Sequence, residues 1–462
     1  MSEVTYDYSE LYRQYRPQGG VLTTTAFLAV VACVINCALP QIEMLLTAGS
    51  VPVPVAVIKI ACFCLLTLLA LTYGRLDLSA FPTGMWLAAM TFLFLDFSYL
   101  WLWEGKTPAD IILGYNAYYC PLIFAPLACA FTGRLSEKSA TRILVSIFLV
   151  CAMIGWAQFI SQKPVIQMAS SDGNFRIYIS WWTALGQRSI RAFGVFGTAL
   201  EYGSFAVLIA AIGIGMCGRP KGWIKGVPLY LLAAACCYTT LTRVVYVQLA
   251  FTTFAAIAFT FGRRLRRMIW QPLIGLVLGS FVAFSGIAKL VGQTGTVYDA
   301  SSLDLRLLQW EIFGAQFLHS TFLQKMLGLG FSQAEKPAIV PLRDEMFGSF
   351  TNVLVDNMYL ALALHIGLVG MVIIVGLLWA LWRRLRIETV KRPTPLLIGI
   401  ASFWSTFLLT GMFNLELAQY GFWFLIAIML LQRDGEADVG SLGLRQPHTL
   451  FGLASERARS VS

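Results

Sequence analysis

The sequence predicts an all-α polytopic membrane protein with about 12 transmembrane helices and a long extracytoplasmic loop that carries an amphipathic helix. Of its 462 residues, 58% are hydrophobic and only 13% are charged. Soluble domains have roughly 25% charged residues. The mean hydropathy is +0.70. The apolar residues also fall into runs of roughly 20, which is the length that crosses a bilayer core.

These apolar runs follow one another along the chain and are separated mostly by short polar joints. They cover 21–40, 51–73, 84–103, 115–132, 142–160, 196–217, 224–242, 244–262, 272–291, 357–382, 395–413 and 416–432. The residues before the first run are polar and show no signal-peptide pattern, so the first span is expected to remain in the protein.

Lysine and arginine are concentrated in the joints on one side. These joints carry Arg75, Arg134, Lys138, Arg142, Arg219, Lys221, Lys225, Arg263, Arg264, Arg266, Arg267, Arg383, Arg384, Arg386, Lys391 and Arg392. By the positive-inside rule this side is cytoplasmic. The formal net charge of +10 therefore indicates membrane topology, and no nucleic-acid partner is predicted.

The topology divides the chain into five parts. We predict a cytoplasmic N-terminal tail at 1–20, nine helices within 21–291 with an outer loop at 161–195, an extracytoplasmic catalytic loop at 292–355, three helices within 356–432, and a disordered cytoplasmic tail at 433–462. All ten cysteines lie inside or at the ends of apolar spans, which gives no disulfide framework and no metal-binding spacing. No cofactor or metal is predicted.

The two long outer loops carry arginines that the positive-inside rule does not explain. Arg191 precedes a glycine-rich entry into the sixth helix, and Glu201 lies about one turn inside that helix. A guanidinium offers a planar fork of donors that suits phosphate, and glycine lets a ligand approach the backbone. An interfacial arginine beside glycines used for helix packing would give the same pattern.

Two further arginines face outward. Arg243 lies between the seventh and eighth helices among Thr239, Thr240 and Thr242, with almost no loop to move in, although a plain loop arginine is the alternative. Arg306 belongs to the amphipathic helix, which has Leu303, Leu307, Trp310 and Phe313 at helical spacing and is followed by a glycine-rich turn at 327–332. A solvated face of a surface helix is the alternative for Arg306.

The remaining polar residues of interest lie at the start of the tenth helix and inside the second and third helices. Asp356 and Asn357 stand at the start of the tenth helix with Tyr359, where Asp356 acts either as a general base or as a helix cap. Lys59 and Asp96 lie at nearly the same depth in the second and third helices, so we predict an ion pair between them. Apart from these two residues and Pro126, the mid-membrane positions are expected to be apolar.

The central half of the chain, from about 188 to 380, resembles the superfamily of O-antigen ligases and Wzy-type polysaccharide polymerases. The resemblance rests on Arg191-Ala-Phe-Gly-Val-Phe-Gly, on the Thr-Arg243 joint, on Leu305-Arg306 followed by Leu327-Gly-Leu-Gly330, and on Asp356-Asn357-Met-Tyr-Leu before Gly367-Leu-Val-Gly370. The chain departs from the family in two places. It has Asp356-Asn357 where many members have His-Asn, and His365 where they often have Glu.

The resemblance implies a metal-independent membrane glycosyltransferase whose donor is an oligosaccharide on undecaprenyl pyrophosphate. It would polymerise repeat units into exopolysaccharide or O-antigen at the periplasmic face of a bacterial inner membrane, in contact with membrane lipids and with a chain-length co-polymerase as a candidate partner. Guanidinium groups stabilise the charge on a departing pyrophosphate, so the predicted catalytic arginines are Arg191, Arg243 and Arg306. Arg188, Asn357 and Tyr359 are predicted to bind substrate.

The base that takes the proton of the attacking hydroxyl is left open between Asp356, Glu201 and Glu416, with His319 and His365 as the histidine candidates. The alternative functions are an O-antigen ligase, which transfers the polysaccharide to lipid A core, and a polysaccharide or solute transporter. An aromatic belt or the mouth of a lipid groove would account for Trp101, Trp103, Tyr115, Tyr118, Tyr119, Trp181 and Trp182.

Overall fold

The computed structural model describes residues 19–35, 55–73, 78, 81–162, 179–182, 187–196, 199–262, 313–330, 358–410 and 417–431. This part of the chain is helical except for its joints and one antiparallel hairpin, β1 (Ile179–Trp182) with β2 (Gln187–Ile190). The helices are α2 (Gly19–Ile35), α4 (Val55–Tyr73), α5 (Thr83–Leu102), α6 (Pro108–Tyr118), α7 (Cys120–Ile123), α8 (Ala125–Cys129), α9 (Glu137–Ser161), α10 (Ala199–Cys217), α11 (Trp223–Thr239), α12 (Arg243–Phe261), α16 (Phe322–Leu327), α18 (Met358–Lys391), α19 (Pro395–Thr410) and α20 (Leu417–Leu430).

Five helices in the described residues are long and apolar enough to cross a membrane, namely α5, α9, α10, α12 and α18. Shorter apolar helices include α2, α4, α11 and α19. The prediction of a helical membrane protein is confirmed at this level, and the count of twelve spans stays a prediction. The predicted span at 272–291 and the tail at 433–462 lie outside the described residues, as do residues 1–18 and most of the loop at 292–355.

The predicted single span at 115–132 is wrong. The chain forms three short helices there, α6, α7 and α8. Pro121 and Pro126 each lie in the first turn of a new helix, at the start of α7 and of α8. Proline cannot donate the backbone hydrogen bond of a helix interior and its ring clashes with the preceding turn, so each proline begins a helix instead of continuing one.

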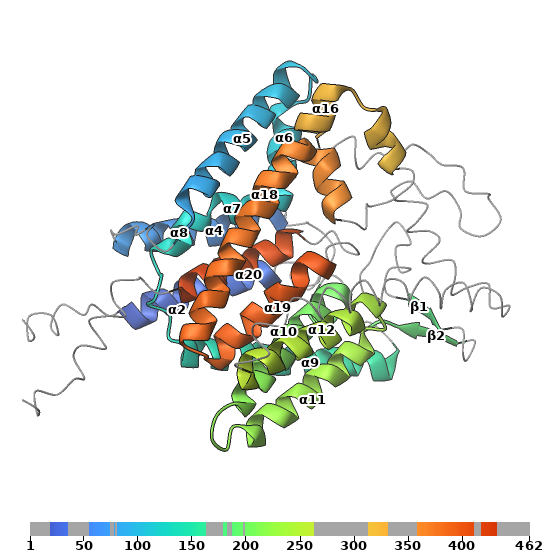
Figure 1. Cartoon of the computed structure of the whole chain (residues 1–462). Helices are drawn as coiled ribbons and strands as arrows, with labels where there is room; N and C mark the ends of the chain where they lie inside the picture. Colours follow the sequence, from blue (N-terminus) through green and yellow to red (C-terminus); the bar gives the residue numbers. More distant parts are fainter. Residues whose placement is uncertain are drawn as a thin grey trace, which may run out of the picture.

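Helix α10 is the centre of one group of helices. Nearly all of its side chains from Ala199 to Gly215 are buried, and it packs against α9, α11, α12 and α19. Small residues allow the close approach to α11, because a β-carbon on Gly213 would lie 2.9 Å from the carbonyl oxygen of Gly226. Figure 1 shows α9, α10, α11 and α12 gathered at one end of the molecule.

A second group contains α5, α6, α16 and the first half of α18. Figure 1 shows these four elements together at the other end of the molecule, with α18 running from there toward α19. The two groups are therefore joined by one long helix, whose backbone is interrupted at Gly367.

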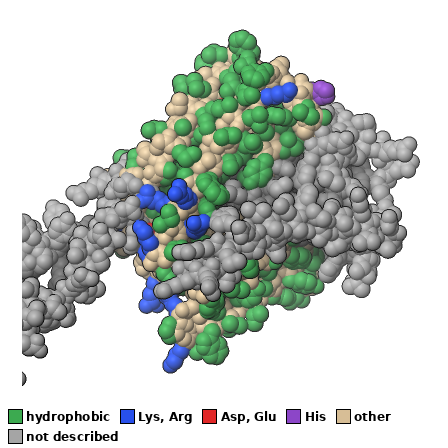
Figure 2. Space-filling view, viewed as in Figure 1, with side chains coloured by type: hydrophobic (Ala, Val, Ile, Leu, Met, Phe, Trp, Pro, Cys, Tyr) green, Lys and Arg blue, Asp and Glu red, His purple; other side chains and the backbone are tan. Residues whose placement is uncertain are grey.

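The surface matches a membrane environment. Figure 2 shows a face covered largely by hydrophobic side chains, with lysine and arginine gathered along one edge. Exposed apolar residues include Phe94, Leu102 and Trp103 on or beside α5, and Met153 and Ile160 on α9. Large exposed apolar side chains on so many helices are expected in contact with lipid rather than with water.

Arg392 joins three helices at the basic edge. Its Nη1 lies 2.9 Å from Oε1 of Glu137 at the start of α9, and its Nε lies 2.5 Å from Oε1 of Glu388 on α18. Its Nη2 donates to the carbonyl oxygen of Leu430 on α20. One half-buried guanidinium therefore fixes the relative positions of α9, α18 and α20.

Arg392→Ala is expected to lower the free energy of unfolding by about 1–2 kcal/mol, because three charge-assisted contacts are lost at a partly exposed site. Denaturation in detergent micelles at low and high salt measures this. Arg383→Ala, at an exposed position on α18, the helix that ends just before Arg392, is the matched control and should change stability by less than about 0.5 kcal/mol. Equal stability of the two variants would contradict the proposed role of Arg392.

Candidate functional site at the start of helices α10 and α12

Buried Gln158 on α9 holds the loop that follows Arg191. Its Oε1 accepts hydrogen bonds from the backbone N–H groups of Phe193 (3.0 Å) and Gly194 (2.9 Å). Its Nε2 donates to the carbonyl oxygen of Gly194 at 2.9 Å. Three hydrogen bonds from one buried amide fix this loop against α9, so the position of the neighbouring Arg191 is set by the bundle.

The same loop is joined to the end of α11. The N–H group of Ala192 donates to the carbonyl oxygen of Thr239 at 3.0 Å. Thr239 is the last residue of α11, and Arg243 is the first residue of α12. The structure therefore brings the backbones at Arg191 and Arg243 to the same end of the bundle, although they are far apart in the sequence.

Helix α10 begins at this end as well. A β-carbon on Gly203 would overlap the side chain of Val245, so the first turns of α10 and α12 are in direct contact. The next residue of α10, Ser204, donates to Oε1 of Gln248 at 3.1 Å. Glu201 lies in the first turn of α10 and is buried.

Three of the predicted catalytic positions, Arg191, Arg243 and Glu201, thus share one end of α10 and α12. At this end Arg191 and the helix N-termini favour an anion, whereas the carboxyl group of buried Glu201 opposes one. Arg191 is half-buried and lies close enough to Tyr246 of α12 for its charge to act on that hydroxyl group. The N-termini of α10 and α12 both point here, and each carries the positive end of a helix dipole.

The remaining predicted site residues are distributed as follows. Arg188 lies on β2 opposite Trp181 of β1, and the structure describes only its backbone, as it does for Arg243. Arg306, Asp356, Asn357 and Glu416 lie outside the described residues. His319 is exposed at the end of a helix that covers 313–319. The proposed roles of these residues remain predictions.

The start of α18 packs into the hydrophobic core. Tyr359 is half-buried against the main core, and His365 is buried with its ring 5.4 Å from that of Tyr118. The predicted glycine-rich turn lies beside it, because the N–H groups of Leu329 and Gly330 donate to the carbonyl oxygens of Leu364 (2.7 Å) and His365 (3.2 Å). His365 is 3% exposed and Glu201 is 8% exposed, so either side chain would have to be uncovered to act as a base on a sugar hydroxyl.

Two expectations from the aromatic and buried polar residues need correction. Tyr115 and Tyr119 are buried, so they do not belong to an aromatic belt at the lipid surface, whereas Trp101 and Trp103 are exposed as such a belt requires. The interior is also more polar than expected, because Gln158 and Gln248 are fully buried. Each makes hydrogen bonds that join two segments of the bundle.

Asp96 is buried, but the structure shows a different partner from the predicted one. Its Oδ2 is 2.5 Å from the hydroxyl oxygen of Tyr115. Lys59 lies within α4, and its side chain is outside the described residues, so the ion pair stays a prediction.

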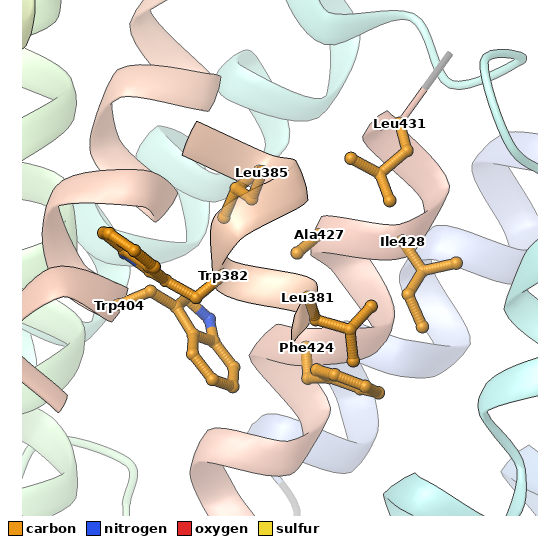
Figure 3. A pocket seen from close by; sticks show the side chains of 8 residues that line it. All are labelled: Leu381, Trp382, Leu385, Trp404, Phe424, Ala427, Ile428 and Leu431. Carbon is orange, nitrogen blue, oxygen red and sulfur yellow. The ribbon is translucent and has the colours of Figure 1, made fainter. Parts of the chain in front are cut away.

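A very small apolar pocket of about 10 Å³ lies between α18, α19 and α20. Figure 3 shows its lining, which includes Trp382, Trp404 and Phe424. No lining residue is charged, so this pocket is not a candidate for chemistry on a pyrophosphate.

Gln158 is not among the site residues predicted from the sequence, although the sequence carries a signal for it. Gln158 is the one amide in the apolar run 142–160. A polar side chain within a membrane span is expected to face the bundle and to have a partner there. The partner itself could not be foreseen, because it is the backbone of a loop about 36 residues away.

Gln158→Leu is expected to lower the free energy of unfolding by about 2–4 kcal/mol, because it leaves two buried N–H groups and one carbonyl group without a partner. Denaturation of the purified protein in detergent measures this. Gln162→Leu, at an exposed position at the end of the same helix, is the matched control and should be nearly neutral. If the two variants are equally stable, Gln158 does not hold the loop.

No protein-family model matches the chain, and no curated protein is significantly similar to it. The resemblance described from the motifs therefore stays a prediction.

Proposed function

We propose that this chain is a membrane glycosyltransferase that polymerises undecaprenyl-pyrophosphate-linked oligosaccharide repeat units into exopolysaccharide or O-antigen, at the periplasmic face of a bacterial inner membrane. The observation that carries the proposal is the hydrogen bond between Ala192 and Thr239, which joins the Arg191 loop to the joint that bears Arg243. The backbones at two arginines from distant segments are thereby held at one end of the bundle, which supports joint binding of a pyrophosphate by their guanidinium groups.

In the proposed reaction a sugar hydroxyl of the acceptor attacks the anomeric carbon of the donor. The bond between that carbon and the pyrophosphate oxygen breaks, and the pyrophosphate leaves with its bonding electrons. Arg191 and Arg243 stabilise the developing negative charge, assisted by the positive ends of α10 and α12. The proton of the attacking hydroxyl passes to a carboxylate, for which Glu201 and Asp356 are the candidates.

The side of the membrane follows from the basic residues. Helix α10 runs from the proposed site at Ala199 to the joint that carries Arg219, Lys221 and Lys225. If that joint is cytoplasmic, as the positive-inside rule predicts, the arginine site faces the periplasm. The donor, whose lipid carrier spans one leaflet, would then reach the site from that leaflet.

One observation supports the alternative function as a transporter. Helix α18 is interrupted at Gly367, and transporters often bind substrate at interrupted helices. However, the carbonyl groups of Leu364 and His365 next to this break accept hydrogen bonds from Leu329 and Gly330. These carbonyls are thus already used by the protein backbone, so we favour the enzyme over the transporter.

The test is polysaccharide analysis in a strain that lacks the gene. If the chain is a polymerase, the deletion strain accumulates single lipid-linked repeat units and regains long chains when the wild-type gene is supplied. Accumulation of full-length chains on the lipid carrier, with none attached to lipid A core, would identify a ligase instead. Unchanged polysaccharides would reject both glycosyltransferase assignments.

A further inference from the structure

Asp96 is a buried carboxyl group that the proposed reaction does not use. It lies on α5 and is fully buried inside the bundle. Its Oδ1 is buried without a hydrogen-bond partner among the described residues, while its Oδ2 lies 2.5 Å from the hydroxyl oxygen of Tyr115 on α6. An ionisable side chain within a membrane span is costly unless it is paired or has a function.

Counting protons indicates the charge state of this carboxyl group. The hydroxyl oxygen of Tyr115 also lies 3.1 Å from the carbonyl oxygen of Leu93. A tyrosine hydroxyl has one proton, and a carbonyl oxygen can only accept. If Asp96 is ionised, two acceptors compete for that proton. If Asp96 is protonated, Oδ2 donates to Tyr115 and Tyr115 donates to Leu93, so both hydrogen bonds are made.

The groups that face Asp96 do not favour a charge. On α5 itself the nearest ionisable residue is Tyr99, which donates to Oε1 of Glu104 at 2.6 Å, while the exposed hydroxyl group of Ser98 donates to the carbonyl oxygen of Phe94. Tyr115 comes from α6, and Tyr119 is the residue that follows the end of α6. From α18 comes His365, on the far side of Tyr118, and α4 contributes Lys59, whose side chain the structure does not describe. In the described residues no lysine or arginine forms an ion pair with Asp96.

Helix α6 connects this carboxyl group to the interruption in α18. Tyr118 lies one turn after Tyr115, and its ring centroid is 5.4 Å from that of His365. His365 stands two residues before Gly367, where the helix is interrupted, and its carbonyl oxygen accepts from Gly330. The ring contact between Tyr118 and His365 therefore links the helix that carries Tyr115 to the end of the first half of α18.

We propose that Asp96 is a proton-binding site in the membrane interior. Asp96 carries its proton while α5, α6 and the first half of α18 are packed as in this structure. On release, the bond between Oδ2 and hydrogen breaks and the proton passes to a water molecule. The carboxylate that remains requires solvation, which disturbs the contact between α6 and α18.

The experiment is infrared spectroscopy of the purified full-length protein in nanodiscs during a pH titration. We expect the carbonyl-stretching band of a protonated carboxylic acid in the wild type at neutral pH. It should be absent in Asp96→Asn and retained in Asp110→Asn, which alters an exposed carboxyl group on α6. Tyr115→Phe should shift the band, because the hydrogen-bond partner of Asp96 is lost.

Hydrogen exchange tests the connection to α18. Above the midpoint of the titration, residues 358–366 of the wild type should exchange faster than intrinsic pH effects explain. Asp96→Asn, which keeps a neutral side chain at every pH, should show only the intrinsic effect. Equal behaviour of wild type and variant would overturn the connection to α18.

The same variants distinguish a neutral, proton-binding Asp96 from an ionised Asp96 that is paired with Lys59, because the two predict opposite effects on stability. A neutral Asp96 predicts that Asp96→Asn and Lys59→Met each fold with wild-type stability. No protonated-acid band in the wild type at any pH, or destabilisation of both variants with rescue by the charge swap, would overturn the proposal. These measurements need no enzymatic activity, so they stand apart from the test of the glycosyltransferase.

Discussion

Arg243→Ala is expected to reduce the synthesis of long polysaccharide chains by roughly 100-fold or more, while the protein inserts into the membrane normally. Removing one preorganised donor from a site of developing negative charge typically has an effect of this size. Arg243 is the first residue of α12, and the first turns of α12 and α10 are in direct contact. Chain-length profiles of complemented deletion strains measure the effect.

Two further variants sharpen this test. Arg243→Lys keeps the charge but loses the planar fork of donors, so it should restore activity only in part. Arg219→Ala removes an exposed arginine from the joint at the opposite end of α10 and should restore full-length chains. If Arg243→Ala restores long chains as well as Arg219→Ala does, Arg243 is not part of a catalytic site.

Gly367→Ala is expected to destabilise the protein by about 3 kcal/mol or more, combining backbone strain with overpacking. Gly367 has φ +67° and ψ −179°, a conformation that only glycine adopts readily. A β-carbon there would also overlap the carbonyl oxygen of Met326. Gly328 faces it with φ +96°, and a β-carbon on Gly328 would overlap the carbonyl oxygen of His365.

The matched control for Gly367→Ala lies on the same helix. A β-carbon on Gly376 would meet only the terminal methyl group of Met85, at 2.8 Å, and that flexible side chain can move. Gly376→Ala should therefore be nearly neutral, because alanine also favours the helix. Unfolding in detergent compares the two variants. Equal stability would show that the interruption in α18 does not require glycine.

The general class of this protein could be read from its sequence because membrane insertion depends on local composition. A run of apolar residues must form a helix in lipid, since no water is present to satisfy its backbone groups. The helices α5, α9, α10 and α12 accordingly lie within a few residues of their predicted bounds. Prediction failed at 115–132, where apolar composition continues through Pro121 and Pro126 but helix geometry does not.

The candidate site could be predicted only as separate pieces. Arg191, Glu201 and Arg243 stood out because charge at the end of a membrane span is unusual, and this signal is local. Their proximity depends on the hydrogen bonds of Gln158 and on the bond between Ala192 and Thr239, neither of which leaves a pattern in the sequence.

Asp96 shows the same difference between what the sequence predicts and what the tertiary structure decides. Its depth in the membrane followed from counting residues along α5, and that count indicated a buried charge in need of a partner. The partner that the structure describes is Tyr115, because the short helix α6 turns its hydroxyl group into the bundle. Composition and periodicity decide which segments enter the membrane, because the free energy of transfer into lipid depends on the residues of each segment itself. Which polar groups then meet depends on how the helices pack, and this contact between distant segments is settled only in the tertiary structure.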